Sequence, residues 1–210
     1  MLKPPPFTHD RRGTAALEFA MVLPLLLLIL AGLSEASRAI DAWRKITLAA
    51  RTVADLTSQG DTQNPLSTGL MNDIFAITAP VMRPFDASGV TVVVSALGVD
   101  PARSTLVPQV CSSVAFGGGT ARAVGPAADL TVPPGYQSQG MRYLLVEMTG
   151  RYTPLIGTAL VKLVDGFSDT VTLSASVPWP IRGGQTYGSN TVTEIVLPGA
   201  SPKACDGSTP

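Results

Sequence analysis

The sequence is poor in the residues on which most active sites and metal sites depend. Its 210 residues include one histidine, His9, and two cysteines, Cys111 and Cys205. No C-x-x-C or G-x-S-x-G pattern occurs, and the glycines at 117–119 are not followed by a lysine. The usual zinc ligand sets, a serine nucleophile with its histidine base and a phosphate-binding loop are therefore missing. We expect a non-catalytic protein with no metal and no cofactor.

Charge is scarce as well. Charged residues make up 14% of the chain, and 15 basic residues balance 15 acidic ones. This balance gives no electrostatic footprint for nucleic acid, so we expect no nucleic-acid partner. The acidic residues of the later chain are scattered, and we interpret them as solvated surface charges: Glu147, Asp165, Asp169 and Glu194.

The dominant feature that is present is an apolar run from Thr14 to Leu33, in which Glu18 is the only charge. About 20 helical residues cross a bilayer, so the run is long enough to span one. Three basic residues and one acidic residue precede it (Lys3, Asp10, Arg11 and Arg12), whereas the charges that follow it nearly cancel. This asymmetry favours a cytoplasmic leader at 1–13, a transmembrane helix at 14–35 and a chain that continues outside.

The start of the run carries a family pattern. Gly13, four further residues and the pair Glu18-Phe19 resemble the processing site of type IV prepilins, as used in Flp/Tad pilus systems. The continuation is similar to the start of TadE/TadG-like proteins in Pro24 and the four leucines after it, in Gly32, Glu35 and Arg38, and in the segment 49–56. The resemblance covers roughly the first 60 residues.

The resemblance implies a role for each residue of the motif. A prepilin peptidase would cut between Gly13 and Thr14, where glycine allows close approach of the backbone to the protease. Glu18 would then meet the freed amine of a neighbouring subunit, which would offset the cost of burying both charges. The implied partners are the peptidase, other Tad pilus or pseudopilin subunits and the lipid bilayer.

Two other interpretations of the same stretch stay open. A secretory signal peptide has a basic start and an apolar centre, and Ser34-Glu35-Ala36 could serve as its cleavage site. Glu18 and the continuation of the apolar pattern count against it. A plain uncleaved anchor, with Glu18 pointing to headgroup water, is the second alternative.

Helical periodicity continues beyond the predicted membrane segment. Apolar residues recur at helical spacing at Ala36, Ile40, Trp43, Ile46, Ala50, Val53 and Leu56/Thr57. We predict one helix from about Thr14 to about Gln59, with Gly60 as its C′ glycine and 36–60 as its periplasmic part. Trp43 fits either the interfacial aromatic belt or packing against the outer domain.

Residues 61–210 then predict a periplasmic α+β domain. A short helix around 70–78 is expected to stop at Pro80. Alternating patterns predict three strands, at 90–97, 143–149 and 170–177, and a fainter one at 192–197. The Gly- and Pro-rich segment 98–140 is expected to be a long irregular loop, within which a weak strand could lie. The predicted fold is pilin-like, with the long helix packed on a small, mainly antiparallel sheet.

Both cysteines follow the predicted membrane segment. In an oxidising periplasm, a possible disulfide between Cys111 and Cys205 would close a loop of about 95 residues and contribute up to roughly 4–5 kcal/mol. Two free thiols are the alternative, because spacing alone does not pair cysteines.

We therefore expect a membrane-anchored pseudopilin or assembly factor for Flp/Tad pilus biogenesis, single-pass in a bacterial inner membrane and facing the periplasm. The alternative is a single-pass or exported envelope binding module unrelated to pili. An exported enzyme is a third option, for which the sequence offers no converging acids.

Overall fold

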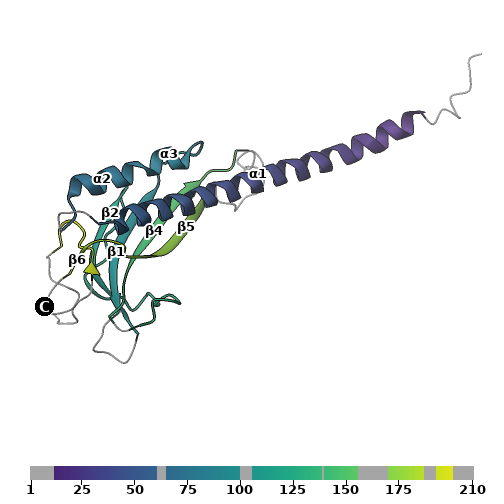
Figure 1. The fold of residues 1–210 in the computed structure, drawn as a ribbon. Helices are drawn as coiled ribbons and strands as arrows, with labels where there is room; N and C mark the ends of the chain where they lie inside the picture. Colours follow the sequence, from purple (N-terminus) through teal and green to yellow (C-terminus); the bar gives the residue numbers. More distant parts are fainter. Residues whose placement is uncertain are drawn as a thin grey trace, which may run out of the picture. The chain divides into compact units, whose positions relative to one another are not determined.

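The computed structural model describes residues 12–60, 65–99, 106–138, 140–155, 170–186 and 193–200. The chain divides into two compact units, Met1–Ile40 with Thr153–Asp169 and Asp41–Tyr152 with Thr170–Pro210. Helix α1 (Arg12–Ser58) belongs to both units, and all the remaining elements belong to the second. Figure 1 shows α1 and the helices and strands that follow it.

The single helix that the sequence predicts is confirmed. It is 47 residues long and contains Pro24, a residue that helices in apolar surroundings tolerate. It ends one residue before the predicted boundary, and Gly60 has a φ of 68°, as a C′ glycine requires. The amides of Arg182 and Gly183 each donate to the Ser58 carbonyl at 2.9 Å, which satisfies one of the carbonyls that the helix end leaves unpaired.

Five antiparallel strands form the main sheet in the order β3-β2-β1-β4-β5. The strands are β1 (Thr91–Val99), β2 (Pro108–Phe116), β3 (Gly125–Pro126), β4 (Arg142–Tyr152) and β5 (Val171–Pro180). A two-stranded sheet pairs β6 (Gln185–Thr186) with β7 (Thr193–Glu194). The three strands with clear alternation, at β1, β4 and β5, are therefore confirmed, as is the α+β class.

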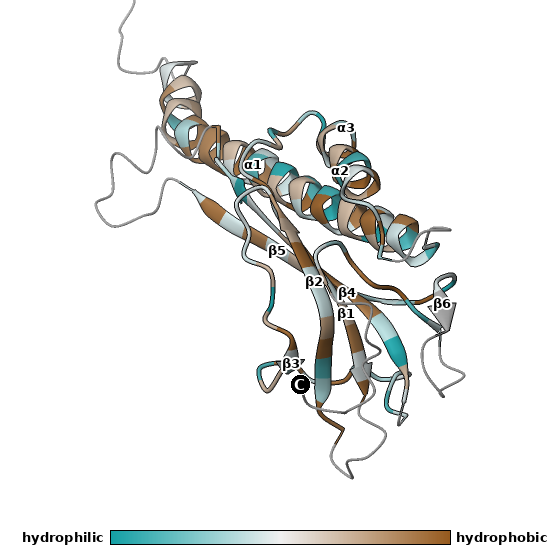
Figure 2. Cartoon of the chain, turned by 90° about the vertical axis from the view of Figure 1, so that its left-hand side faces the viewer, coloured by the Kyte–Doolittle hydropathy of each residue, from teal (hydrophilic) through white to brown (hydrophobic). Residues whose placement is uncertain are grey.

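One face of the sheet is covered by α1 and by two short helices, α2 (Thr68–Ala76) and α3 (Thr78–Met82) (Figure 2). The second half of α1 buries Ile46, Ala49, Ala50, Val53 and Ala54 against Val92, Val94, Leu144, Val146 and Met148. Small side chains bring the helix close to the sheet. A Cβ on Gly150 would lie 2.9 Å from Cδ1 at the end of the Ile46 side chain, so this glycine of β4 lets Ile46 pack close to the strand.

The opposite face carries a second core that alternation alone did not predict. Leu97, Val99, Tyr143 and Leu145 point to this side and are covered by the segment 127–136. The rings of Tyr136 and Tyr143 lie 4.8 Å apart, and burial raises the pKa of Tyr143 to about 12. The C-terminal half of β1, from Ser95 to Val99, is consequently buried on both faces.

The prediction of one long irregular loop at 98–140 is wrong in part, because β2 and β3 lie within this segment. β2 pairs with β1 in register from Val92↔Phe116 to Val99↔Pro108, with a shift between Ala96 and Leu97. Cys111, Ser112 and Ser113 interrupt the apolar alternation of this strand, which begins at Pro108 and is followed by Gly117. The alternation of apolar residues is hard to recognise in the sequence because β2 offers hydroxyl groups to both faces of the sheet.

Two smaller expectations are also wrong. Pro80 does not stop the helical region, since it lies in the first turn of α3, where a missing N–H breaks no helical hydrogen bond. The strand expected at 192–197 is limited to Thr193–Glu194. Ile195, Val196 and Leu197 are buried beyond it without continuing the ladder, so burial rather than strand pairing explains their apolar character.

Candidate membrane anchor and assembly surface

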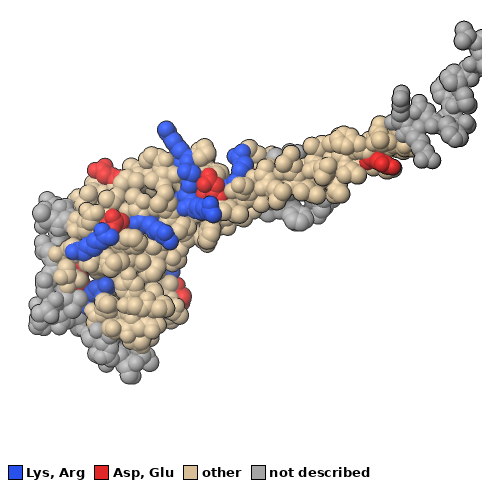
Figure 3. All heavy atoms as spheres, turned by 45° about the vertical axis from the view of Figure 1, so that its right-hand side comes forward, with Lys and Arg blue, Asp and Glu red and all other residues tan. Residues whose placement is uncertain are grey.

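The first half of α1 presents apolar side chains in all directions. Every residue from Gly13 to Leu30 is exposed, including Leu17, Phe19, Met21, Val22, Leu25 to Leu28, Ile29 and Leu30. Figure 3 shows this stretch almost without charge, with one acidic group near its start. The 20 residues from Thr14 to Leu33 extend about 30 Å, the thickness of a bilayer core. Among the described residues, α1 is the one helix long and apolar enough to cross a membrane, which suggests a single-pass anchor.

The four motif residues lie together at the beginning of this helix. Gly13 and Thr14 belong to the first turn, and Glu18 and Phe19 to the second. Thr14 and Glu18 are four residues apart and therefore share a face, about 6 Å apart along the axis. The Gly13–Thr14 junction therefore lies in the first turn of α1, next to the beginning of the helix.

Within the part of the chain that the structure describes, no contact requires a glycine at position 13. A Cβ added there would meet no atom within 4 Å, and the same is true of Gly32. Glycine early in a helix costs up to about 1 kcal/mol relative to alanine. Any requirement for glycine at this position must therefore come from a contact outside the described chain.

The polar end of the apolar stretch is tied to the β4–β5 connection. The Leu155 amide donates to Glu35 Oε1 at 3.2 Å, within the first compact unit. The Glu35 carboxylate therefore binds the main chain of this connection.

Trp43 packs against the outer domain, one of its two expected positions. Its Nε1 donates to the Ser174 carbonyl of β5 at 3.2 Å, while its side chain stays half exposed.

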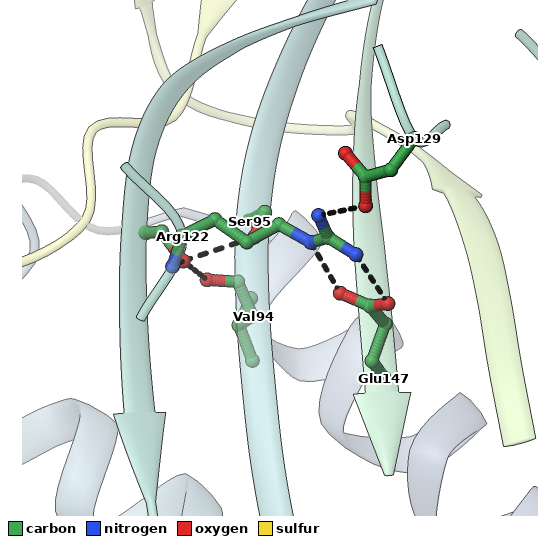
Figure 4. Close-up of polar contacts among 6 residues, drawn as sticks. Val94, Ser95, Arg122, Asp129 and Glu147 are labelled. Carbon is green, nitrogen blue, oxygen red and sulfur yellow. Dashed lines mark hydrogen bonds and ion pairs between the residues drawn. The ribbon is translucent and has the colours of Figure 1, made fainter. Parts of the chain in front are cut away.

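Two of the acidic residues that the sequence left scattered, Glu147 and Glu194, are engaged in ion pairs. Arg122 binds Glu147 through two nitrogens, at 2.6 and 2.7 Å, and Asp129 through a third at 2.7 Å (Figure 4). Hydrogen bonding to Glu147 raises the pKa of the Arg122 guanidinium, and hydrogen bonding to Arg122 lowers that of the Asp129 carboxyl. The Arg122 amide also donates to Ser113 Oγ at 3.0 Å, and Ser113 Oγ donates to the Val94 carbonyl at 3.1 Å. This network fastens the segment after β2 onto the sheet.

A second pair, Arg142 with Glu194, is buried. The two side chains are 4% and 5% exposed and joined by a short hydrogen bond. A Cβ on Gly98 would lie 2.8 Å from the Arg142 guanidinium, so this glycine makes room for it. Glu147 and Glu194 therefore stabilise the fold through their arginine partners. Asp165 and Asp169 lie outside the described residues.

Nothing in the described residues gathers three or more histidine, cysteine or acidic side chains as metal ligands would. Cys111 lies on β2, and Cys205 lies outside the described part of the chain, so their pairing stays a prediction.

Comparison with known proteins identifies the beginning of the chain. Residues 13–55 match the family model described as TadE-like protein, which agrees with the resemblance seen in the sequence. No curated protein and no solved structure matches the chain. The TadE-like segment covers the exposed apolar half of α1 and most of the half that packs on the sheet.

Proposed function

From the premise that residues 13–55 are TadE-like, which supports a Tad pilus-associated function, we propose that the chain is a membrane-anchored pseudopilin or assembly factor of the Flp/Tad pilus. It lies in a bacterial inner membrane with its leader in the cytoplasm and its α+β domain in the periplasm. It acts by packing of its N-terminal helix against other pilus subunits and not by catalysis.

The observation that carries this proposal is the position of the family match. The match begins at Gly13, where the apolar exposed helix begins, and includes the single carboxylate at Glu18. A carboxylate within the apolar core of a bilayer costs roughly 2.5–3.5 kcal/mol at the centre and less near the interface. A helix keeps such a residue when a partner charge compensates it. The amine released at Thr14 of an adjacent subunit has the required charge.

Processing by a prepilin peptidase is the second part of the proposal. The open space around Gly13 supports it, because no contact among the described residues requires a glycine there. Cleavage would free the amine of Thr14 in the first turn of α1.

The test is the N-terminal sequence of the membrane-extracted protein, with and without its cognate peptidase. We expect a start at Thr14 that depends on the peptidase. Gly13→Ala should block cleavage, whereas Gly32→Ala is the matched control, since a Cβ at either site meets nothing within 4 Å. Glu18→Gln should leave cleavage intact and prevent pilus assembly.

Other outcomes favour other functions. A start near Ser37 would establish a signal peptide and overturn the pilus proposal. An intact leader with normal piliation in both the Gly13 and Glu18 variants would leave the membrane-anchored binding module as the surviving function. An intact leader with loss of piliation in the Glu18 variant would indicate an uncleaved assembly factor.

A further inference from the structure

A groove runs between the second half of α1 and strand β5. It encloses about 480 Å³ and is lined by Trp43, Thr47 and Arg51 of the helix and by residues 174–179 of the strand. The three helix residues are four apart and form one line along the flank of α1. All these residues belong to the same compact unit.

One wall of the groove is an edge strand. β5 is the last strand in the sheet order, with β4 as its one partner among the described strands. An edge strand presents a row of main-chain N–H and C=O groups that can pair with another chain. β5 is 10 residues long, and Val171, Thr172, Ser174 and Ser176 are exposed.

Two observations show which residues direct their main chain to the outer edge. The Ser174 carbonyl accepts the indole N–H of Trp43 and so points away from β4. Pro178 and Pro180 also lie in the strand, at even-numbered positions like Ser174. Proline has no N–H to donate, so a strand accepts it only where that position faces the unpaired edge. The even-numbered residues therefore offer their main chain outward, and the N–H groups of Thr172, Ser174 and Ser176 lie along the open edge.

The groove also has a charge and an aromatic lining. Arg51 is exposed and has no ion-pair partner among the described residues, and the same holds for Arg44, seven positions earlier on the same face. Trp43 and Trp179 line the groove, and the Nε1 of Trp179 is buried without a hydrogen-bond partner in the described structure. An acidic segment would complement the arginines.

We propose that this groove binds an extended, acidic segment of another protein, which adds as a sixth strand to the outer edge of β5. The main chain of the segment would pair with Thr172, Ser174 and Ser176, and Pro178 and Pro180 end the pairing because they supply no N–H. The Ser174 carbonyl can accept a second hydrogen bond beside that from Trp43, since it has two lone pairs. A carboxylate of the segment would meet Arg51. This proposal does not depend on whether the partner belongs to a pilus.

The chain contains an intrinsic reporter for the test. Trp43 and Trp179 are its only tryptophans, and both line the groove. The experiment titrates the full chain in detergent micelles with a synthetic seven-residue peptide that alternates valine with aspartate or threonine. Tryptophan emission is recorded, and we expect a saturable change. A peptide with proline at its centre should give none, and one with lysine in place of aspartate should bind more weakly.

Matched variants separate strand addition from nonspecific binding. Ser176→Pro removes one outward N–H without touching the ladder to β4 and should weaken binding at least about tenfold. Ser176→Ala keeps that N–H and should bind as the wild type does. Arg51→Gln should weaken binding about two- to fivefold, the contribution of one exposed ion pair. Circular dichroism and thermal unfolding check that each variant is folded.

The proposal is overturned by equal affinity of folded Ser176→Pro and wild-type protein, by binding of the proline peptide, or by the absence of saturation at millimolar peptide. A wild-type chain that dimerises through this edge, as shown by a dimer that Ser176→Pro abolishes, would also overturn it by making a second copy the occupant.

Discussion

Arg142 and Glu194 are 52 residues apart in the chain and are buried together. Arg142 begins β4 and Glu194 ends β7, and Arg142 also donates to the Gly140 carbonyl at 3.3 Å. Burial of two charges is favourable only when each has its partner, because the desolvation of each ion costs several kcal/mol. The pair therefore fixes β7 to β4 by making any separation costly.

Replacement of Glu194 by alanine leaves the buried guanidinium without its carboxylate. We expect Glu194→Ala to lower the free energy of unfolding by about 3 kcal/mol, measured by urea denaturation of the full chain in detergent. The double variant Arg142→Met/Glu194→Leu should regain most of this loss. Asp129→Asn is the control, since that carboxylate is 63% exposed and its removal should cost less than about 1 kcal/mol. Similar small losses for both single variants would contradict the role given to the buried pair.

Two stretches of chain, 181–186 and 193–197, form a clasp at the C-terminal end of α1. Its amides at Arg182 and Gly183 bind the Ser58 carbonyl, and its Val196 carbonyl accepts the Leu66 amide at 2.8 Å. The Leu197 amide donates to Ser112 Oγ of β2 at 3.1 Å. The clasp thereby joins the C-terminal end of the anchor helix to the chain that follows it and to the sheet.

The clasp approaches the main chain at the end of α1 so closely that only a glycine fits there. A Cβ on Gly183 would lie 1.9 Å from the Gln59 carbonyl oxygen, a backbone atom that has no freedom to rotate away. We expect Gly183→Ala to destabilise the domain by at least about 2 kcal/mol in thermal or urea unfolding. Gly69→Ala, in α2 with no atom within 4 Å of its Cβ, is the matched control and should be neutral or stabilise by up to about 1 kcal/mol. If both variants unfold alike, the crossing is looser than the structure shows.

The whole molecule combines an exposed apolar helix with a domain that buries the second half of the same helix. Leu27 and Leu48 illustrate the division, because each is 55% exposed and both lie on α1. Leu27 is in the centre of the apolar stretch, whereas Leu48 lies on the outer face of the packed half. If the first half is a membrane anchor, the two positions face different solvents.

An arginine at these positions distinguishes lipid from water. Leu27→Arg should oppose insertion by roughly 2.5–3.5 kcal/mol and reduce the fraction that resists alkaline extraction from membranes. Leu48→Arg should leave that fraction unchanged, since its side chain is expected to face water. Equal extraction of both variants would contradict a membrane position for the first half of α1.

The sequence predicted the elements whose signals are local. The apolar run and the helical periodicity of α1 follow from side-chain spacing, as does the alternation of β1, β4 and β5. Gly13 and Glu18 could be recognised because they stand out against an apolar background and match a family pattern over 13–55. A membrane helix needs no distant part of the chain to satisfy its backbone, so its sequence describes it almost completely.

The rest depended on residues brought together from distant parts of the chain. β2 is a strand because β1 supplies a partner for it, although its own serines obscure the pattern. The glutamate partners of Arg142 and Arg122 lie 52 and 25 residues away, and no spacing rule connects them. The groove beside β5 exists only because α1 and β5, separated by 131 residues at the Trp43–Ser174 contact, lie side by side. Local spacing specifies which face of an element is apolar, whereas the choice of what covers that face is made by long-range packing.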